Sequence, residues 1–133
     1  MSTRKIQKNA TRILNALGYP EVELSVVVVD DDAIAELNEH YLNHTGPTNV
    51  ISFPMLEGKY SNITPDLLGD VVISADTAKR EANEAGIPMT QRFDQLLIHG
   101  ILHLVGYDHV HSDEEAAVME KKSDELMELI RKE

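Results

Sequence analysis

The sequence contains no cysteine, and only 12 of its 133 residues are lysine or arginine. The absence of cysteine excludes disulfide bonds and thiolate metal ligands, and it fits a cytoplasmic protein. The 23 aspartates and glutamates outnumber the basic residues and give a formal net charge of −11. Because phosphate binding normally draws on lysine and arginine, this balance argues against strong intrinsic binding to a nucleic acid.

Long hydrophobic runs are also missing. No apolar stretch reaches the roughly 18 residues that a membrane-spanning helix needs, so we expect no membrane segment. The hydrophobic content of 42% and the charged content of 26% are ordinary for a globular protein. The length suits one domain with a single core, and we see no repeat or linker, so residues 1–133 are predicted to form one domain.

Hydrophobic periodicity predicts five helices and three strands in the order helix, strand, helix, strand, strand, helix, helix, helix. The valine run 26–29 is β-branched and predicts a well-buried strand. The predicted helices cover residues 4–17, 34–43, 75–85, 91–104 and 113–130, and the predicted strands cover 21–29, 50–53 and 68–73. Residues 55–67 show no period and are predicted to form a surface loop.

Side chains that accept a hydrogen bond from a helical N–H precede four of these helices. One of the three aspartates at 30–32 is predicted to cap the second helix. Ser74 and Thr90 are predicted to cap the third and fourth helices. Ser112, with glutamate three residues later, matches a capping box for the last helix.

Three of the six histidines lie in the stretch 99–109, which reads HGILHLVGYDH. His99 and His103 are four residues apart and share one helix face, so both imidazoles can bind one ion at about 2.0–2.1 Å. Gly106 accepts the left-handed conformation that ends helices, and this turn would bring His109 back as a third ligand. Three protein ligands leave a fourth position for water, which is the arrangement of a catalytic zinc site.

The same spacing is found in the metzincin zinc peptidases, which carry a glutamate directly after the first histidine as general base. Here that position is Gly100, which cannot transfer a proton. The peptidase interpretation therefore lacks its catalytic residue. A hydrolase remains chemically feasible, because water on a metal ion titrates near neutrality. His111 is close enough to compete with His109, but the glycine turn favours His109.

The stretch 99–109 resembles the signature of the YbeY family, bacterial metal-dependent endoribonucleases of ribosomal RNA maturation. Two other segments resemble that family in the same order and spacing, namely 47–54, PTNVISFP, and 68–74, LGDVVIS. The similarity runs from about Leu37 to the C-terminus.

The resemblance implies a fold and a site. The fold is a single α/β or α+β domain with a small mixed sheet of about four strands, covered by helices, and a metal site at the end of a buried helix. Residues 59–63 are the candidate for the fourth strand. The metal is expected to be one zinc ion, or another divalent transition metal, held by His99, His103 and His109.

The resemblance also makes Asn49 and Ser52 candidates for lining the cleft near the metal and binding substrate. Asp70 is a third candidate, either for substrate binding, as a general base, or as a partner that orients a ligand histidine. An ordinary aspartate at the start of a strand, satisfied by backbone amides, is the alternative for Asp70. The general base itself is not identified.

The implied function is single-strand-specific endoribonuclease activity in ribosomal RNA maturation and ribosome quality control. The family usually has an arginine after the tyrosine of its L-N-x-x-Y-R segment, but here Tyr41 is followed by Leu42. That arginine is a natural candidate for binding phosphate. We therefore expect weak unaided RNA binding, with affinity supplied by the ribosome or a small-subunit ribosomal protein.

Two other functions stay open at this point. One is a zinc peptidase or amidase, which the ligand spacing favours and Gly100 opposes. The other is a non-catalytic ribosome-assembly factor with a structural metal, which Leu42 and the acidic composition favour.

Overall fold

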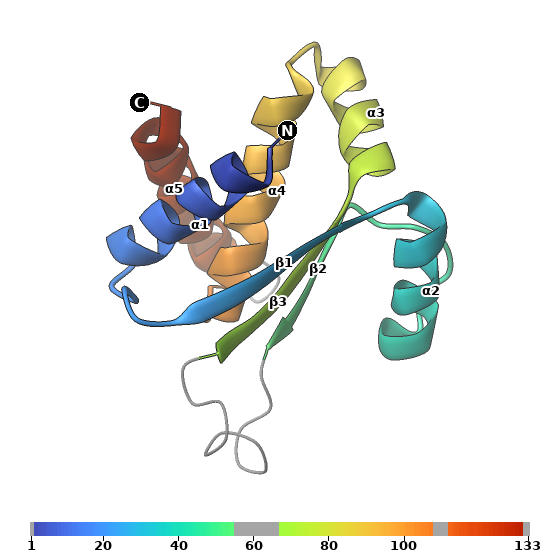
Figure 1. Cartoon of the computed structure of the whole chain (residues 1–133), viewed down its shortest axis with the longest axis horizontal. Helices are drawn as coiled ribbons and strands as arrows, with labels where there is room; N and C mark the ends of the chain where they lie inside the picture. The colour runs from blue at the N-terminus through green and yellow to red at the C-terminus, as the bar shows by residue number, and fades with distance from the viewer. Residues whose placement is uncertain (1, 55–66, 108–111, 132–133) are drawn as a thin grey trace.

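A computed structural model describes residues 2–54, 67–107 and 112–131, which form five helices and three strands (Figure 1). The elements in chain order are α1 (Thr3–Ala16), β1 (Glu23–Val29), α2 (Asp31–Leu42), β2 (Val50–Pro54), β3 (Leu67–Ser74), α3 (Ala75–Ala85), α4 (Met89–Leu104) and α5 (Asp113–Arg131). This is the α+β class that the sequence predicted, with one small mixed sheet and helices around it.

The sheet has the order β1-β3-β2. Strand β3 is central; it pairs in parallel with β1 and antiparallel with β2. The described part of the chain has three strands, so the predicted count of about four is not confirmed, and the candidate fourth strand, 59–63, lies outside the described residues.

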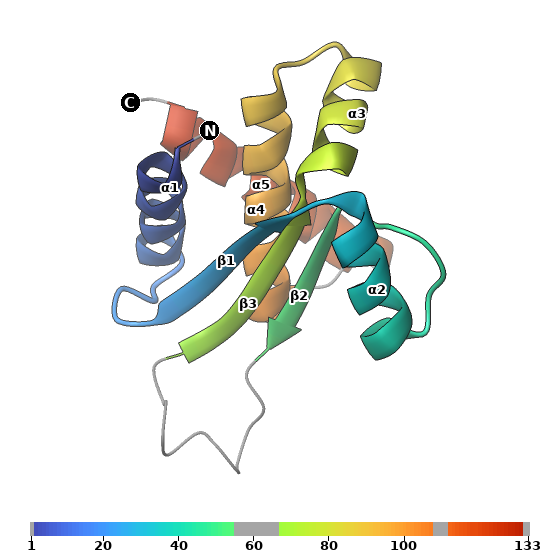
Figure 2. The ribbon, with the colours of Figure 1, turned by 45° about the vertical axis from the view of Figure 1, so that its right-hand side comes forward.

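Side chains of β3 alternate between the two faces of the sheet. Val71 and Ile73 belong to the main core with α1, α4 and α5, whereas Val72 packs with Ile34 of α2 on the other side. Figure 2 shows the same layers, with α4 along one face of the sheet and α2 beside the other. Each face of the sheet is thus covered by a different set of helices.

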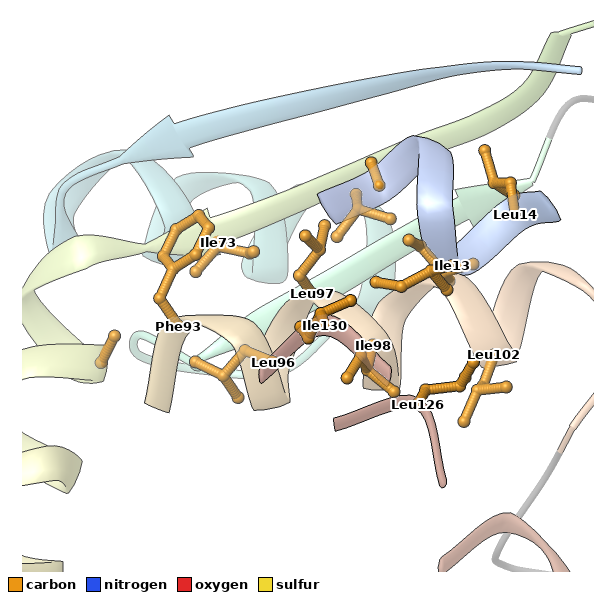
Figure 3. Packing of buried hydrophobic residues seen from close by; sticks show 14 of the residues in the cluster. Ile13, Leu14, Ile73, Phe93, Leu96, Leu97, Ile98, Leu102, Leu126 and Ile130 are labelled. Atoms are coloured by element: carbon orange, nitrogen blue, oxygen red, sulfur yellow. The ribbon is translucent and has the colours of Figure 1, made fainter. Parts of the chain in front are cut away.

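The main core is centred on α4. Figure 3 shows α4 side chains such as Phe93 and Leu97 reaching toward β3, while others lie against α1 and α5. Seven residues of α4 are buried: Phe93, Leu96, Leu97, Ile98, Gly100, Ile101 and Leu102. This confirms the prediction of a buried helix and gives its histidines a fixed support.

Strand β1 corrects one prediction. The valine run was expected to be well buried, but Val27 and Val28 are each 42% exposed. The reason is topological, because β1 lies at the edge of the described sheet and pairs only with β3. Its β-branched residues suit a strand in either position, so they did not distinguish an edge from a centre.

The predicted caps are confirmed at three helices. Asp30 accepts from the N–H of Ala33, Ser74 accepts from that of Thr77, and Ser112 accepts from that of Glu115. Thr90 is the exception, because α4 begins at Met89, two residues earlier than predicted, with Pro88 at the N-cap and no side-chain cap bond. Proline has its φ fixed near the helical value, which suits it to the start of a helix.

The start of α2 is tied to the start of α3 through Asp31. Its carboxylate accepts hydrogen bonds from the hydroxyls of Thr77 at 2.6 Å and Ser74 at 2.7 Å, and it forms an ion pair with Arg80 at 2.6 Å. These three contacts lower the pKa of Asp31 to about 2. The second aspartate of the run at 30–32 therefore joins two helices while the first caps one.

Candidate metal centre

The position of α4 on the sheet depends on Gly100. A Cβ at this residue would lie 2.6 Å from Cγ1 of Val71 and 3.3 Å from Oγ of Ser52. The Ser52 hydroxyl donates a 2.8 Å hydrogen bond to the carbonyl oxygen of Gly100. The glycine therefore lets the helix backbone approach β2 and β3 closely, directly beside His99 in the chain.

His99 and His103 lie on successive turns of α4, and their side chains meet. Their Nε2 atoms are 3.0 Å apart. The ring centroids are separated by 4.5 Å at an interplanar angle of 76°. Both residues are half-buried, whereas Gly100 and Leu102 between them are buried. The predicted pair is thus brought together on the half-buried side of a helix whose opposite side belongs to the core.

The chain turns after α4 in the way that the sequence predicted. Gly106 has φ of 104°, and the N–H of Tyr107 donates to the carbonyl of Leu102 at 2.9 Å. His109, the predicted third ligand, and its competitor His111 lie outside the described residues. Within residues 2–54, 67–107 and 112–131, no three histidine, aspartate or glutamate residues form a group that could hold a metal ion.

A pocket of about 400 Å³ lies beside the histidine pair. It is formed by α4, α5 and the residue that precedes β2. The side chains that line it are those of Asn49, Arg92, Gln95, Leu96, Ile98, His99, Glu120, Ser123, Asp124 and Met127. Asn49 and His99 therefore line the same pocket.

Glu81 of α3 accepts hydrogen bonds from two polar residues that line this pocket. Its carboxylate accepts from Nε of Arg92 at 3.0 Å and from Nδ2 of Asn49 at 3.3 Å. Arg92 also donates from Nη1 to Oε1 of Gln95 at 2.8 Å. Sequence analysis missed both Glu81 and Arg92. The spacing of Arg92, seven residues before His99, could have indicated it, because residues at that interval share a helix face.

The two other predicted substrate-binding residues lie on different faces of the sheet. Ser52 pairs with Val71 in the β2–β3 ladder and faces α4. Asp70 pairs with Phe53, which belongs to the small core on the α2 side. Since side chains alternate along a strand, Asp70 is on the α2 side as well. The sheet therefore brings Ser52 to the histidine-bearing helix and does not bring Asp70 there.

Leu42 is the last residue of α2 and is 44% exposed. It thus lies on the helix that covers the face of the sheet opposite α4.

The carboxyl of Asp94 on α4 has a shifted pKa. Burial raises the pKa of Asp94, partly offset by a hydrogen bond from Asn9 and by the charge of Lys5. Asp94 lines a different hollow, between α1 and the amino end of α4, and not the pocket at His99.

No helix in the described ranges is both long enough and apolar enough to cross a membrane.

Comparison with known proteins gives consistent matches over nearly the whole chain. A family model described as "Endoribonuclease YbeY" matches residues 1–131. The Endoribonuclease YbeY of Geobacter sulfurreducens is 53% identical over 131 residues, which are 98% of this chain and 87% of that protein. That of Geobacter metallireducens is 51% identical over 134 residues, covering 100% of this chain and 89% of the relative.

Among solved structures, the solution structure of TM1509 from Thermotoga maritima aligns with a TM-score of 0.69 and 27% identity. The alignment covers 96% of this chain and 79% of the other.

Proposed function

Because this chain belongs to the endoribonuclease YbeY family, and so is a hydrolase that acts on RNA, we propose that it cuts with a metal ion held by His99, His103 and His109. The observation that supports this assignment is the meeting of two half-buried imidazoles on one side of α4, with their Nε2 atoms 3.0 Å apart. His109 completes the set in this proposal because the turn at Gly106 directs the chain back after the helix.

The two histidines suit zinc. Two nitrogens that each lie about 2.0–2.1 Å from a tetrahedral zinc ion are separated by roughly 3.3 Å. The separation of 3.0 Å in this structure is close to that value. Imidazole nitrogen is a preferred zinc ligand, and the sequence has no cysteine to provide a softer site. Zinc is therefore the metal that we propose, with another divalent transition metal as the alternative.

The chain's own residues would organise the reaction around that ion. His99 and His103 bind it as neutral imidazoles, and Gly100 and Ser52 fix the helix that carries them. Asn49 would contact the RNA from the pocket that it shares with His99. When bound, a divalent ion polarises a phosphate oxygen and makes water more acidic.

Two nucleophiles are open to this site. Attack by water would leave no cyclic product, whereas attack by the RNA's own 2′-hydroxyl would leave a 2′,3′-cyclic phosphate. Detection of the cyclic product would exclude water as the nucleophile.

The peptidase alternative loses support from the surroundings of Gly100. Its Cβ position is already occupied by Val71, so the glutamate that metzincins carry after the first histidine could not be accommodated there without moving α4 away from the sheet. The residue needed for that chemistry is excluded by packing as well as by sequence.

We further propose that the RNA is single-stranded ribosomal RNA and that the enzyme works in the cytoplasm with the ribosome or a small-subunit ribosomal protein. The net charge of −11 supports a need for such a partner, because the chain would repel a polyanion over much of its surface.

The test is cleavage of labelled single-stranded RNA by zinc-loaded protein, with His103→Ala protein, shown by circular dichroism to be folded, as the control. Loss of cleavage in the variant supports a histidine-held metal. Equal cleavage by both proteins contradicts it. No cleavage by either, with zinc bound, would favour the non-catalytic assembly factor or a partner-activated enzyme.

A further inference from the structure

Two residues that line the pocket beside His99, Asn49 and Arg92, are joined by Glu81, which lies outside the lining. Asn49 precedes β2, Glu81 belongs to α3, and Arg92 belongs to α4. Glu81 receives the Nε–H of Arg92 on Oε1 at 3.0 Å, and Nδ2 of Asn49 lies 3.3 Å from each of its two carboxylate oxygens. These contacts fix the base of the guanidinium and orient it beside the pocket.

Arg92 lies on the same side of α4 as His99. The two residues are separated by seven positions, or two turns, so their Cα atoms are about 10 Å apart along the helix axis. Both side chains line the pocket of about 400 Å³. A molecule bound at the histidines and extending along this face of α4 would therefore pass Arg92.

Part of the guanidinium remains available for binding. An arginine side chain has five N–H groups. The contacts described for Arg92 use three of its nitrogens once each: Nε and Nη2 with Glu81, and Nη1 with Gln95. One N–H on each terminal nitrogen is left by this count, and the side chain is 27% exposed. A charged N–H of this kind forms a strong hydrogen bond with a phosphate oxygen.

Arg92 differs in charge from the other ionisable residues that line the pocket. Of the described residues that line it, Arg92 is the one lysine or arginine, whereas Glu120 and Asp124 are exposed carboxylates. RNA backbone in this pocket would need a cation to offset its charge. Leu42 stands where the family usually has an arginine, so position 42 cannot supply a cation for the RNA.

We propose that Arg92 binds a backbone phosphate of the RNA that flanks the phosphate being cut, and that Glu81 positions it. This inference rests on the function proposed above, since it takes RNA as the substrate and the histidines as the place of cleavage. The separation of two helical turns is the reason for a flanking phosphate rather than the scissile one.

The competing explanation is that Arg92 and Glu81 form only a structural tie between α3 and α4. Part-exposed ion pairs of this kind contribute little to stability, so such a tie could be lost without consequence for RNA. The two explanations differ in the salt dependence of RNA binding and in the effect of RNA length.

The first experiment measures binding of a fluorescein-labelled hexauridylate by fluorescence anisotropy across a range of salt concentrations, with a chelator present so that the RNA is not cut. Each phosphate contact on a single strand contributes about 0.7 to the slope of log affinity against log salt concentration. We expect Arg92→Met to reduce the magnitude of that slope by about 0.7. An unchanged slope would overturn the proposal.

The second experiment compares cleavage of the hexanucleotide with that of a dinucleoside monophosphate, which carries only the phosphate to be cut. Arg92→Met should lower kcat/KM for the hexanucleotide by about tenfold, mainly through KM, because one charge-assisted contact is typically worth at least that factor. It should leave kcat/KM for the dinucleotide unchanged. Equal losses on both substrates would contradict a flanking contact.

Two further variants serve as controls. Arg80→Met removes another arginine that is paired with a carboxylate, but one that does not line this pocket, and it should change neither slope nor kcat/KM. Glu81→Gln breaks the same ion pair while keeping the guanidinium, so it should keep the salt slope. Because Glu81 positions the guanidinium, Glu81→Gln should still raise KM for the hexanucleotide, and an unchanged KM would show that Glu81 has no positioning role.

The two proposals fail in different ways. If wild-type protein cleaves neither RNA, the proposed function fails, and the slope still decides whether Arg92 binds phosphate.

Discussion

Replacing Gly100 with alanine should destabilise this protein although alanine is the better helix former. In an isolated helix the change would stabilise by about 1 kcal/mol. Here the new Cβ would lie 2.6 Å from Cγ1 of Val71, compared with 3.4–4 Å for an ordinary contact. Extra atoms in a packed core typically cost about 1–3 kcal/mol. Subtracting the gain in helix propensity from this cost, we expect Gly100→Ala to lower the free energy of unfolding by up to about 2 kcal/mol.

A double-mutant cycle with Val71→Ala tests the cause. The second substitution removes both Cγ atoms that the new Cβ would meet, and only the Ser52 hydroxyl at 3.3 Å remains as a tight neighbour, which must move by a few tenths of an ångström. In the Val71→Ala background, Gly100→Ala should be neutral or stabilising by up to about 1 kcal/mol. The coupling energy of the cycle should then be about 1–3 kcal/mol, within the range seen for residues in contact.

The assay is urea unfolding of the four proteins, followed by circular dichroism with a chelator present, so that metal binding does not add to the stability of the folded state. Two results would refute the reasoning. Gly100→Ala could prove more stable than wild type by the amount that helix propensity alone predicts. Alternatively, the two substitutions could be additive, which would mean that Val71 is not what excludes a side chain at this position.

Three other substitutions have outcomes that can be worked out from the structure. Asp31→Asn should destabilise the protein at pH 7. The difference from wild type should vanish as the pH falls toward 2, because the wild-type carboxyl then becomes protonated and loses its stabilising contacts. The pKa of Asp31 is lowered from 3.8 to about 2, which sets that range. Asp94→Asn should instead stabilise at pH 7, since burial raises the pKa of Asp94 and disfavours its charged form, and urea unfolding should show this gain shrinking as acid protonates the wild-type carboxyl. Ser52→Ala should lower the free energy of unfolding by about 1 kcal/mol, because the hydrogen bond to the Gly100 carbonyl is lost. If the folded variant also shows a higher KM for RNA, that would support a contact between Ser52 and the substrate.

Local signals in the sequence were read correctly where the structure depends on neighbours in the chain. Asp30, Ser74 and Ser112 cap helices because each lies three residues before the N–H that it accepts, whatever the rest of the fold does. The approach of His99 to His103 is equally local, since a helix sets that distance by itself.

Features that depend on distant segments were not predictable in this way. A run of valines looks the same in a central and an edge strand, so the exposure of Val27 followed from strand order and not from composition. Glu81 meets Arg92 because α3 packs against α4, and no spacing in the sequence indicates that contact. The face on which Asp70 lies became clear only from the β2–β3 register.

The edge position of β1 has a consequence for how the protein behaves in concentrated solution. The strand reads ELSVVVV, without the proline or lysine that usually protects an edge, and among the described residues no strand pairs with its outer side, where Val27 and Val28 are exposed. Such an edge can template the addition of a strand from another molecule. The net charge of −11 makes folded copies repel one another, and salt screens that repulsion. Added salt should therefore promote aggregation of this protein, whereas a protein with protected strand edges would stay in solution.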